Sequence, residues 1–100
     1  LEQRIFNPLR MTDTAFYISP DKIHRFASSY TPELKVKERY NKSWFQLPER
    51  IQSGGGGLIS TAADYLQFSN MLLNKGQLNG IRLLSEASIN EMTRSQEPEF

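Results

Sequence analysis

Residues 61–76, which read TAADYLQFSNMLLNKG, decide the fold. Thr61 is a good N-cap, and Asp64 follows three residues later as in a variant of the capping box. Apolar residues then recur at helical spacing and predict a broad buried stripe. Its members are Ala62, Tyr65, Leu66, Phe68, Ser69, Leu72 and Leu73. We therefore expect a long helix here, with Phe68 and Leu72 among its buried residues.

After this helix the sequence predicts a hairpin and a second helix. The long helix should end at residue 74 or 75, with Gly76 as the left-handed C′ residue. An Asn-Gly pair at residues 79–80 between apolar residues is a two-residue hairpin signal. Ser85 should then cap a helix over residues 86–92 that packs through Ile89 and Met92.

Before the long helix the sequence predicts shorter elements. Residues 1–6 have apolar side chains at helical spacing, and Pro8 should stop this helix one residue earlier. A serine–proline pair favours a short helix or turn over residues 21–26. Apolar and basic residues alternate over residues 34–40 and predict a half-exposed strand with a basic outer face. Together these elements predict a mainly α chain with short β elements, an α+β fold.

Composition restricts the function further. The chain has 100 residues with 12 Lys and Arg against 11 Asp and Glu, a balance that does not favour a protein that wraps nucleic acid or coats an anionic membrane. The absence of cysteine and the single histidine exclude thiolate zinc sites, a cysteine nucleophile and multi-histidine metal sites. No apolar run approaches the ~20 residues that span a bilayer. We expect no metal, no cofactor, no nucleic-acid partner and no transmembrane segment.

One short motif matches a known nucleophile pattern. Ser19-Pro20-Asp21-Lys22 is literally Ser-x-x-Lys, a spacing that on a helix N-terminus places an amine one turn from a hydroxyl. The spacing is common, and no apolar residues surround the pair to activate the amine. We interpret Ser19 as the N-cap of an exposed helix and not as a nucleophile.

Two other features are given structural interpretations. His24 has no acid or hydroxyl partner fixed by the sequence, and we interpret it as a surface histidine. The basic and aromatic stretch over residues 35–45 has the composition of a nucleic-acid surface. The rest of the chain offers no supporting basic surface, so we interpret this stretch as an amphipathic strand with a solvated face.

The glycine run at residues 54–57 follows Ser53 and precedes the long helix. Successive glycine N–H groups before a helix can bind anions, but Ile59 breaks the Gly-x-Gly-x-x-Gly pattern and no Gly-Lys-Ser/Thr sequence ends the run. A flexible linker is the alternative. Because apolar residues and a capped helix follow at once, we interpret the run as a pinned loop that allows close approach to its backbone.

Several segments, in this order, resemble motifs of one enzyme family. They are PLRMTDT at 8–14, RFA at 25–27, SGGGGLISTAADY at 53–65, MLLNKG at 71–76, LLS at 83–85 and EMT at 91–93. The family is the serine β-lactamase-related hydrolases: class C β-lactamases, their esterase relatives and D-alanyl-D-alanine peptidases. There a helix ends in Pro-Leu-Gly-Met-x-x-Thr, and Gly-Gly-Leu-x-Ser-Thr-x-x-Asp later opens a helix rich in Phe, Met and Leu.

The resemblance implies acyl transfer from an ester, a β-lactam or a D-Ala peptide to a serine in a Ser-x-x-Lys motif. A Tyr-x-Asn motif and a Lys-Thr-Gly or His-x-Gly motif assist in the family, and none of the three stands here at its family position. In the family's order two precede Leu1 and the third follows Phe100. The resemblance therefore implies that residues 1–100 are a single fragment of a larger β-lactamase-like catalytic domain, the incomplete helical portion of a β-lactamase-like or transpeptidase fold, with no second domain.

The implied role of the fragment is a substrate-site wall without a catalytic residue. The wall residues are Ser53, Gly54, Gly55, Gly56 and Gly57. The implied partners are the remainder of its own catalytic domain and, in the parent, a small-molecule acyl substrate. A truncated first helix and the wide apolar stripe also predict self-association of the isolated fragment.

Two positions depart from the family's pattern, and two alternatives stay open. Arg10 stands at the glycine of Pro-Leu-Gly-Met, where a positive φ costs about 1 kcal/mol. Class C β-lactamases carry a tyrosine where Gly56 stands, so esterase-like or peptidase-like relatives are favoured. The alternatives are a non-catalytic binding relative of the same fold and an unrelated small helical interaction module.

Overall fold

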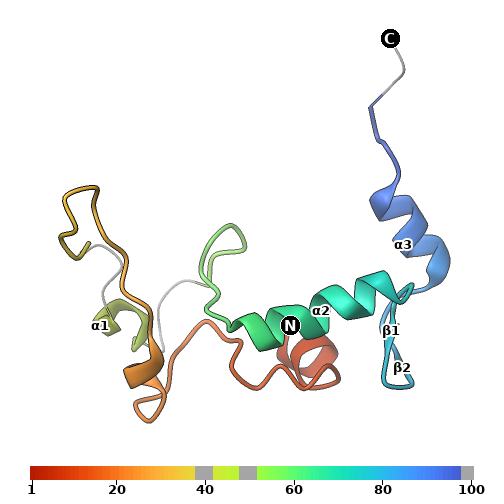
Figure 1. The fold of residues 1–100 in the computed structure, drawn as a ribbon. Coiled ribbons are helices and arrows are strands. Elements are labelled where there is room, and N and C mark those ends of the chain that lie inside the picture. The colour runs from red at the N-terminus through yellow and green to blue at the C-terminus, as the bar shows by residue number, and fades with distance from the viewer. Residues whose placement is uncertain (38–41, 48–51, 98–100) are drawn as a thin grey trace. The chain divides into compact units, whose positions relative to one another are not determined.

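A computed structural model describes residues 1–37, 42–47 and 52–97, and the chain divides into two compact units (Figure 1). Unit 1 comprises Leu1–Thr14 and Ser60–Phe100, and unit 2 comprises Ala15–Ile59. Unit 1 holds the π-helix η1 (Glu2–Phe6), α2 (Ala62–Leu73), β1 (Gln77–Leu78), β2 (Ile81–Arg82) and α3 (Glu86–Thr93). Unit 2 holds the 3₁₀-helix η2 (Ile23–Arg25) and α1 (Lys42–Phe45). The described elements agree with a mainly helical chain that has short β elements.

The first helix forms where the sequence predicts it, but with π-type hydrogen bonds. The amide of Phe6 donates to the Leu1 carbonyl at 3.3 Å, and the amide of Asn7 to the Glu2 carbonyl at 2.9 Å. After the helix the chain turns at Arg10, which adopts a φ of 56°, and the Met11 amide closes the turn on the Phe6 carbonyl at 2.9 Å. An arginine therefore occupies the left-handed conformation that a glycine adopts without steric cost.

Both ends of α2 are fixed by hydrogen bonds within a few residues. At the start, the Thr61 hydroxyl accepts from the Asp64 amide at 3.2 Å, which confirms the predicted N-cap. At the end, the amide of Gly76 donates to the Met71 carbonyl and that of Lys75 to the Leu72 carbonyl. This is a Schellman motif.

In this motif the prediction for Gly76 is wrong by one residue. Asn74 is the C-cap, so Lys75, with a φ of 56°, is the C′ residue. Gly76 follows with a φ of 91°, and a Cβ there would overlap the Leu84 backbone, whose carbonyl carbon would lie 2.8 Å away. Lys75 and Gly76 therefore both have a positive φ, and the glycine stands at the position against which the backbone of Leu84 packs.

The core of unit 1 is narrower than the predicted stripe. It consists of Phe6, Leu9, Met11 and Met71, against which Phe68 and Leu72 pack while only partly buried. Four residues of the predicted stripe are exposed: Ala62, Tyr65, Leu66 and Leu73. The turn that carries Leu9 and Met11 therefore covers only part of the apolar face predicted for α2.

The hairpin and α3 follow as predicted. Strand β1 pairs antiparallel with β2, and Asn79 and Gly80 both have positive φ, as a two-residue hairpin turn requires. The Ser85 hydroxyl accepts from the Ser88 amide at 3.0 Å and caps α3. Within α3, Ile89 is buried but Met92 is exposed, so the predicted packing through Met92 is wrong.

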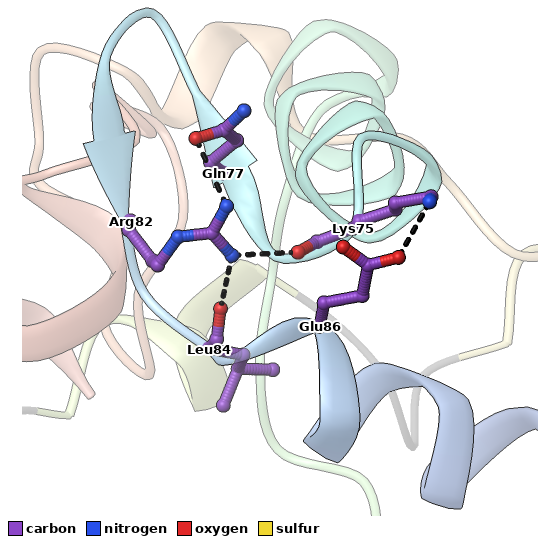
Figure 2. A network of polar contacts seen from close by, with 5 residues as sticks. All are labelled: Lys75, Gln77, Arg82, Leu84 and Glu86. Carbon is purple, nitrogen blue, oxygen red and sulfur yellow. Dashed lines mark hydrogen bonds and ion pairs between the residues drawn. The ribbon is translucent and has the colours of Figure 1, made fainter.

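Arg82 fastens the end of α2 to the hairpin (Figure 2). Its guanidinium donates to the carbonyls of Lys75 at 2.8 Å and Leu84 at 2.9 Å, and to Gln77 Oε1 at 3.1 Å. Beside it, the Lys75 ammonium lies 2.5 Å from Glu86 Oε1 and, by hydrogen bond and charge, lowers the pKa of that exposed carboxyl. The guanidinium thus joins the backbone just after α2 to the backbone just before α3.

Two predictions for unit 2 are wrong. Ser19 does not cap a helix; its carbonyl accepts from the Lys22 amide in a turn, and Lys22 is the N-cap of η2. The predicted strand over residues 34–40 is reduced to one bridge between Tyr30 and Val36, while residues 38–40 lie outside the described residues. Leu34 has a φ of 62° in a turn that reverses the chain, which prevents an extended strand.

The stretch over residues 35–45, interpreted as an amphipathic strand, ends in the helix α1. Phe45 of α1 is buried, its carbonyl accepts from the Ile18 amide at 2.9 Å, and its ring lies 5.1 Å from that of Phe26. Aromatic packing therefore organises this part of unit 2. None of the helices in the described ranges is long and apolar enough to cross a membrane.

We expect Met71→Ala to lower the free energy of unfolding by about 2–5 kcal/mol, because Met71 is 1% exposed at the centre of the core. Leu73→Ala, at a side chain that is 81% exposed, is the matched control and should change it by less than about 0.5 kcal/mol. Urea denaturation followed by circular dichroism measures both. Equal losses would contradict this core.

Gly76→Ala should destabilise the chain by at least about 2 kcal/mol, because it combines a left-handed residue with the overlap at Leu84. Gly80→Ala is the control, since Gly80 also has a positive φ but faces open space. It should cost only the backbone strain, about 1 kcal/mol. The difference between the two midpoints in urea isolates the overlap, and no difference would count against it.

Candidate functional site

The predicted wall residues form an exposed turn in unit 2. Residues 54–56 make the turn, and the Gly55 amide donates to Ser53 Oγ at 3.3 Å. Ser53 and the first three glycines are exposed, whereas Gly57 is buried. The glycine loop, residues 53–57, therefore presents mainly backbone to solvent.

Gly57 differs from the other three glycines. A Cβ at Gly57 would lie 3.1 Å from Phe16 Cδ1 and 3.2 Å from the Ser53 carbonyl oxygen. Nothing lies within 4 Å of a Cβ built at Gly54 or Gly56. The close approach expected of this run is found at Gly57, where the loop closes on its own first residue and on a ring.

The chain that leaves the loop is fastened by a backbone pair. The Ile59 amide donates to the Ala15 carbonyl at 2.9 Å, and the Ala15 amide to the Ile59 carbonyl at 3.1 Å. The two residues form an isolated antiparallel bridge. This bridge is the base of the glycine loop on its C-terminal side.

The residues that follow Ile59 belong to unit 1, which contains a buried carboxylate with several hydrogen-bond partners. Asp64 is 6% exposed, and its Oδ2 accepts from the Asp13 amide at 2.8 Å and from the Thr14 hydroxyl at 2.8 Å. Thr14 Oγ1 also lies 2.7 Å from Ser60 Oγ. Because the Thr14 proton points to the carboxylate, Ser60 is the donor in that bond.

Sequence reasoning missed this cluster. It assigned Asp64 to the capping box, and the Asp64 amide does bond Thr61, but the side chain binds residues about fifty positions away. One signal was present: Thr14 ends the PLRMTDT segment and Asp64 lies near the end of SGGGGLISTAADY, the two segments that resemble family motifs most fully. The bond between Thr14 and Asp64, near the ends of these two segments, was not predicted from the sequence.

The Ser-x-x-Lys match is a turn. The Ser19 hydroxyl hydrogen-bonds the Asp21 carboxylate, and that bond is the main cause of the lowered pKa of Asp21. The Lys22 amide bonds the Ser19 carbonyl. A serine that donates to an exposed carboxylate is not arranged as a nucleophile beside an amine.

The other polar features of the described residues are a surface histidine and a hollow in unit 1. His24 is exposed, as the sequence predicts. Within residues 1–37, 42–47 and 52–97 no three His, Asp or Glu side chains gather as metal ligands would. A hollow in unit 1 at the end of α2 is lined by residues of the hairpin and includes none of the predicted wall residues.

Comparison with known proteins gives a consistent result. The sequence profile of the Beta-lactamase family matches residues 1–100. Two proteins of Mycobacterium tuberculosis are each 38% identical to the chain over 94 residues: "Uncharacterized protein MT1414" of strain CDC 1551 / Oshkosh and "Protein Rv1367c" of strain ATCC 25618 / H37Rv. The match covers 92% of the chain, which spans 23% of the length of each relative.

Gly57→Ala should lower the free energy of unfolding of unit 2 by about 1–3 kcal/mol, because its Cβ would press on Phe16 and on the Ser53 carbonyl. Gly56→Ala, which meets open space, should change it by less than about 0.5 kcal/mol. The single tryptophan, Trp44, lies in unit 2, so its fluorescence in urea reports the unfolding. The opposite ranking would contradict the close approach at Gly57.

Proposed function

The chain belongs to the Beta-lactamase family, and on that premise we propose that it is a segment of a serine hydrolase that works through an acyl-enzyme. The family match over residues 1–100 supports a fold related to serine hydrolases. The chain spans 23% of the length of its relatives in Mycobacterium tuberculosis, which leaves ample sequence for catalytic groups elsewhere.

The proposed chemistry is the transfer of an acyl group from an ester, a β-lactam or a D-Ala peptide. A serine oxygen attacks the carbonyl carbon, the leaving group departs with a proton, and water then hydrolyses the acyl-enzyme. Such a reaction needs a nucleophile, a base and donors for the oxyanion. Within the described residues, the hydroxyls of Ser19 and Thr14 are hydrogen-bonded to carboxylates, and the Ser60 hydroxyl is hydrogen-bonded to that of Thr14. The proposal therefore assigns no catalytic residue to this chain.

The part of the chain assigned to substrate is the glycine loop, Ser53–Gly57. One observation carries this assignment: Gly54, Gly55 and Gly56 are exposed and none has a positive φ. A glycine loses more conformational entropy on folding than other residues, so three glycines that no positive φ requires weaken the fold. Access of a ligand to the backbone would explain why glycine stands at these positions. The N–H groups of such a turn can donate hydrogen bonds to the oxygens of an acyl substrate.

The size of the residue at position 56 favours one group of substrates within the proposal. With glycine there, no side chain occupies the space that a tyrosine fills in class C β-lactamases that the sequence resembles. The open surface suits an ester or a D-Ala peptide with a bulky acyl part. We therefore place esterase-like or peptidase-like activity before β-lactam hydrolysis.

The isolated chain of 100 residues should show no turnover of p-nitrophenyl esters or chromogenic cephalosporins above buffer, because it lacks a positioned nucleophile. The longer natural protein that contains it should turn over at least one of them. Mass spectrometry of the trapped acyl-enzyme should place the adduct on a serine outside these residues.

Ser19→Ala is the matched control and should change neither result. Turnover by the isolated chain that disappears in Ser19→Ala would overturn the assignment of no catalytic residue. A longer protein with neither turnover nor an adduct would support the non-catalytic alternative instead.

A further inference from the structure

We propose that Asp64 is a positioning residue for the glycine loop, an inference that rests on the proposed function in giving that loop to the substrate. Its carboxylate holds Thr14, and through Thr14 it holds Ser60. Ser60 directly follows Ile59, the residue at the base of the loop. The carboxylate is thus hydrogen-bonded, through Thr14, to the residue that directly follows the base of the loop.

Burial makes this carboxylate dependent on its donors. Asp64 is 6% exposed, and a buried carboxylate without hydrogen bonds is strongly destabilising. One oxygen, Oδ2, receives the Asp13 amide and the Thr14 hydroxyl, both at 2.8 Å. The residue stands in the first turn of α2, where the helix dipole favours a negative charge. The helix α2 therefore determines where the carboxylate lies, and the Asp13 amide and the Thr14 hydroxyl bind it there.

The register of the neighbouring backbone carries this restraint toward the loop. Ala15 and Ile59 pair antiparallel, so Thr14 and Ser60 are the adjacent rung of the same register. Their hydroxyls meet at 2.7 Å. A side-chain bond at one rung supports the backbone pair at the next, as cross-strand pairs do in sheets. Gly57, the buried end of the loop, lies two residues before Ile59.

The test uses hydroxyl deletion at Thr14 in the longer natural protein that contains this chain. Thr14→Val keeps the branched shape but removes the bonds to Asp64 and Ser60, whereas Thr14→Ser retains the hydroxyl. Thr93→Val is the matched control, because Thr93 Oγ1 bonds the Ile89 carbonyl within α3 at 2.8 Å, far along the chain from the loop. Asp64→Asn removes the charge while preserving size.

Hydrogen exchange gives a readout independent of activity. In Thr14→Val and Asp64→Asn the Ile59 amide, which bonds the Ala15 carbonyl, should exchange about tenfold faster. The Gly76 amide, which bonds the Met71 carbonyl, should keep its rate. In Thr14→Ser and Thr93→Val both amides should exchange as in the unmodified protein. An unchanged Ile59 amide in Thr14→Val, or an equal acceleration at Gly76, would overturn the positioning role.

Kinetics separate this inference from the proposed function. For a p-nitrophenyl ester, Thr14→Val should raise KM about fivefold and change kcat by less than about twofold, since a displaced wall weakens binding more than chemistry. Thr14→Ser should restore KM. If Ile59 exchange accelerates while KM stays constant, Asp64 positions the loop but the loop is not a substrate wall, and the proposed function fails alone.

Discussion

A carboxylate that is 94% shielded from water needs hydrogen-bond donors, and the need of Asp64 shapes unit 1. Its two donors come from Asp13 and Thr14, at the far end of a separate segment. Meeting that need brings the turn after η1 against the start of α2, and the apolar residues of that turn, Leu9 and Met11, then reach Met71. Hydrogen bonding of the carboxylate and burial of the apolar residues therefore favour the same arrangement.

The features predicted correctly depend on residues that are close in sequence. The Thr61 cap, the Ser85 cap and the Asn-Gly hairpin each close a hydrogen bond over a few positions, so residue type alone determines them. Arg10 does adopt a positive φ, at the position where the family's pattern has a glycine, so the cost expected for that conformation applies. The end of α2 shows the limit of this reasoning. A glycine signals a left-handed residue, yet Lys75 takes the C′ position and Gly76 the next, since the passage of Leu84 decides where a Cβ is forbidden.

The features that were predicted wrongly or missed depend on contacts with segments that are distant in sequence. Helical spacing predicts that Tyr65, Leu66 and Leu73 are apolar on a helix face, but only a covering element decides whether they are buried. Alternation likewise favours a strand over residues 34–40, yet a strand needs a partner, and the turn at Leu34 supplies only one bridge. The Asp64 cluster escaped for the same reason: one sequence cannot show which of several polar residues meet across fifty positions.

For the candidate site, the sequence predicted the glycine run as one unit, whereas the structure distinguishes its members. Four consecutive glycines look equivalent, but packing forbids a Cβ only at Gly57, while Gly54 and Gly56 face open space with ordinary backbone angles. The fold therefore explains one glycine of the run and leaves the exposed ones without a structural cause. Glycine in such positions widens the range of unfolded conformations and so weakens a fold slightly relative to alanine. The glycine loop therefore combines exposed backbone at Gly54, Gly55 and Gly56 with a closely packed end at Gly57. Under the proposed function, that combination suits a surface whose backbone contacts a substrate.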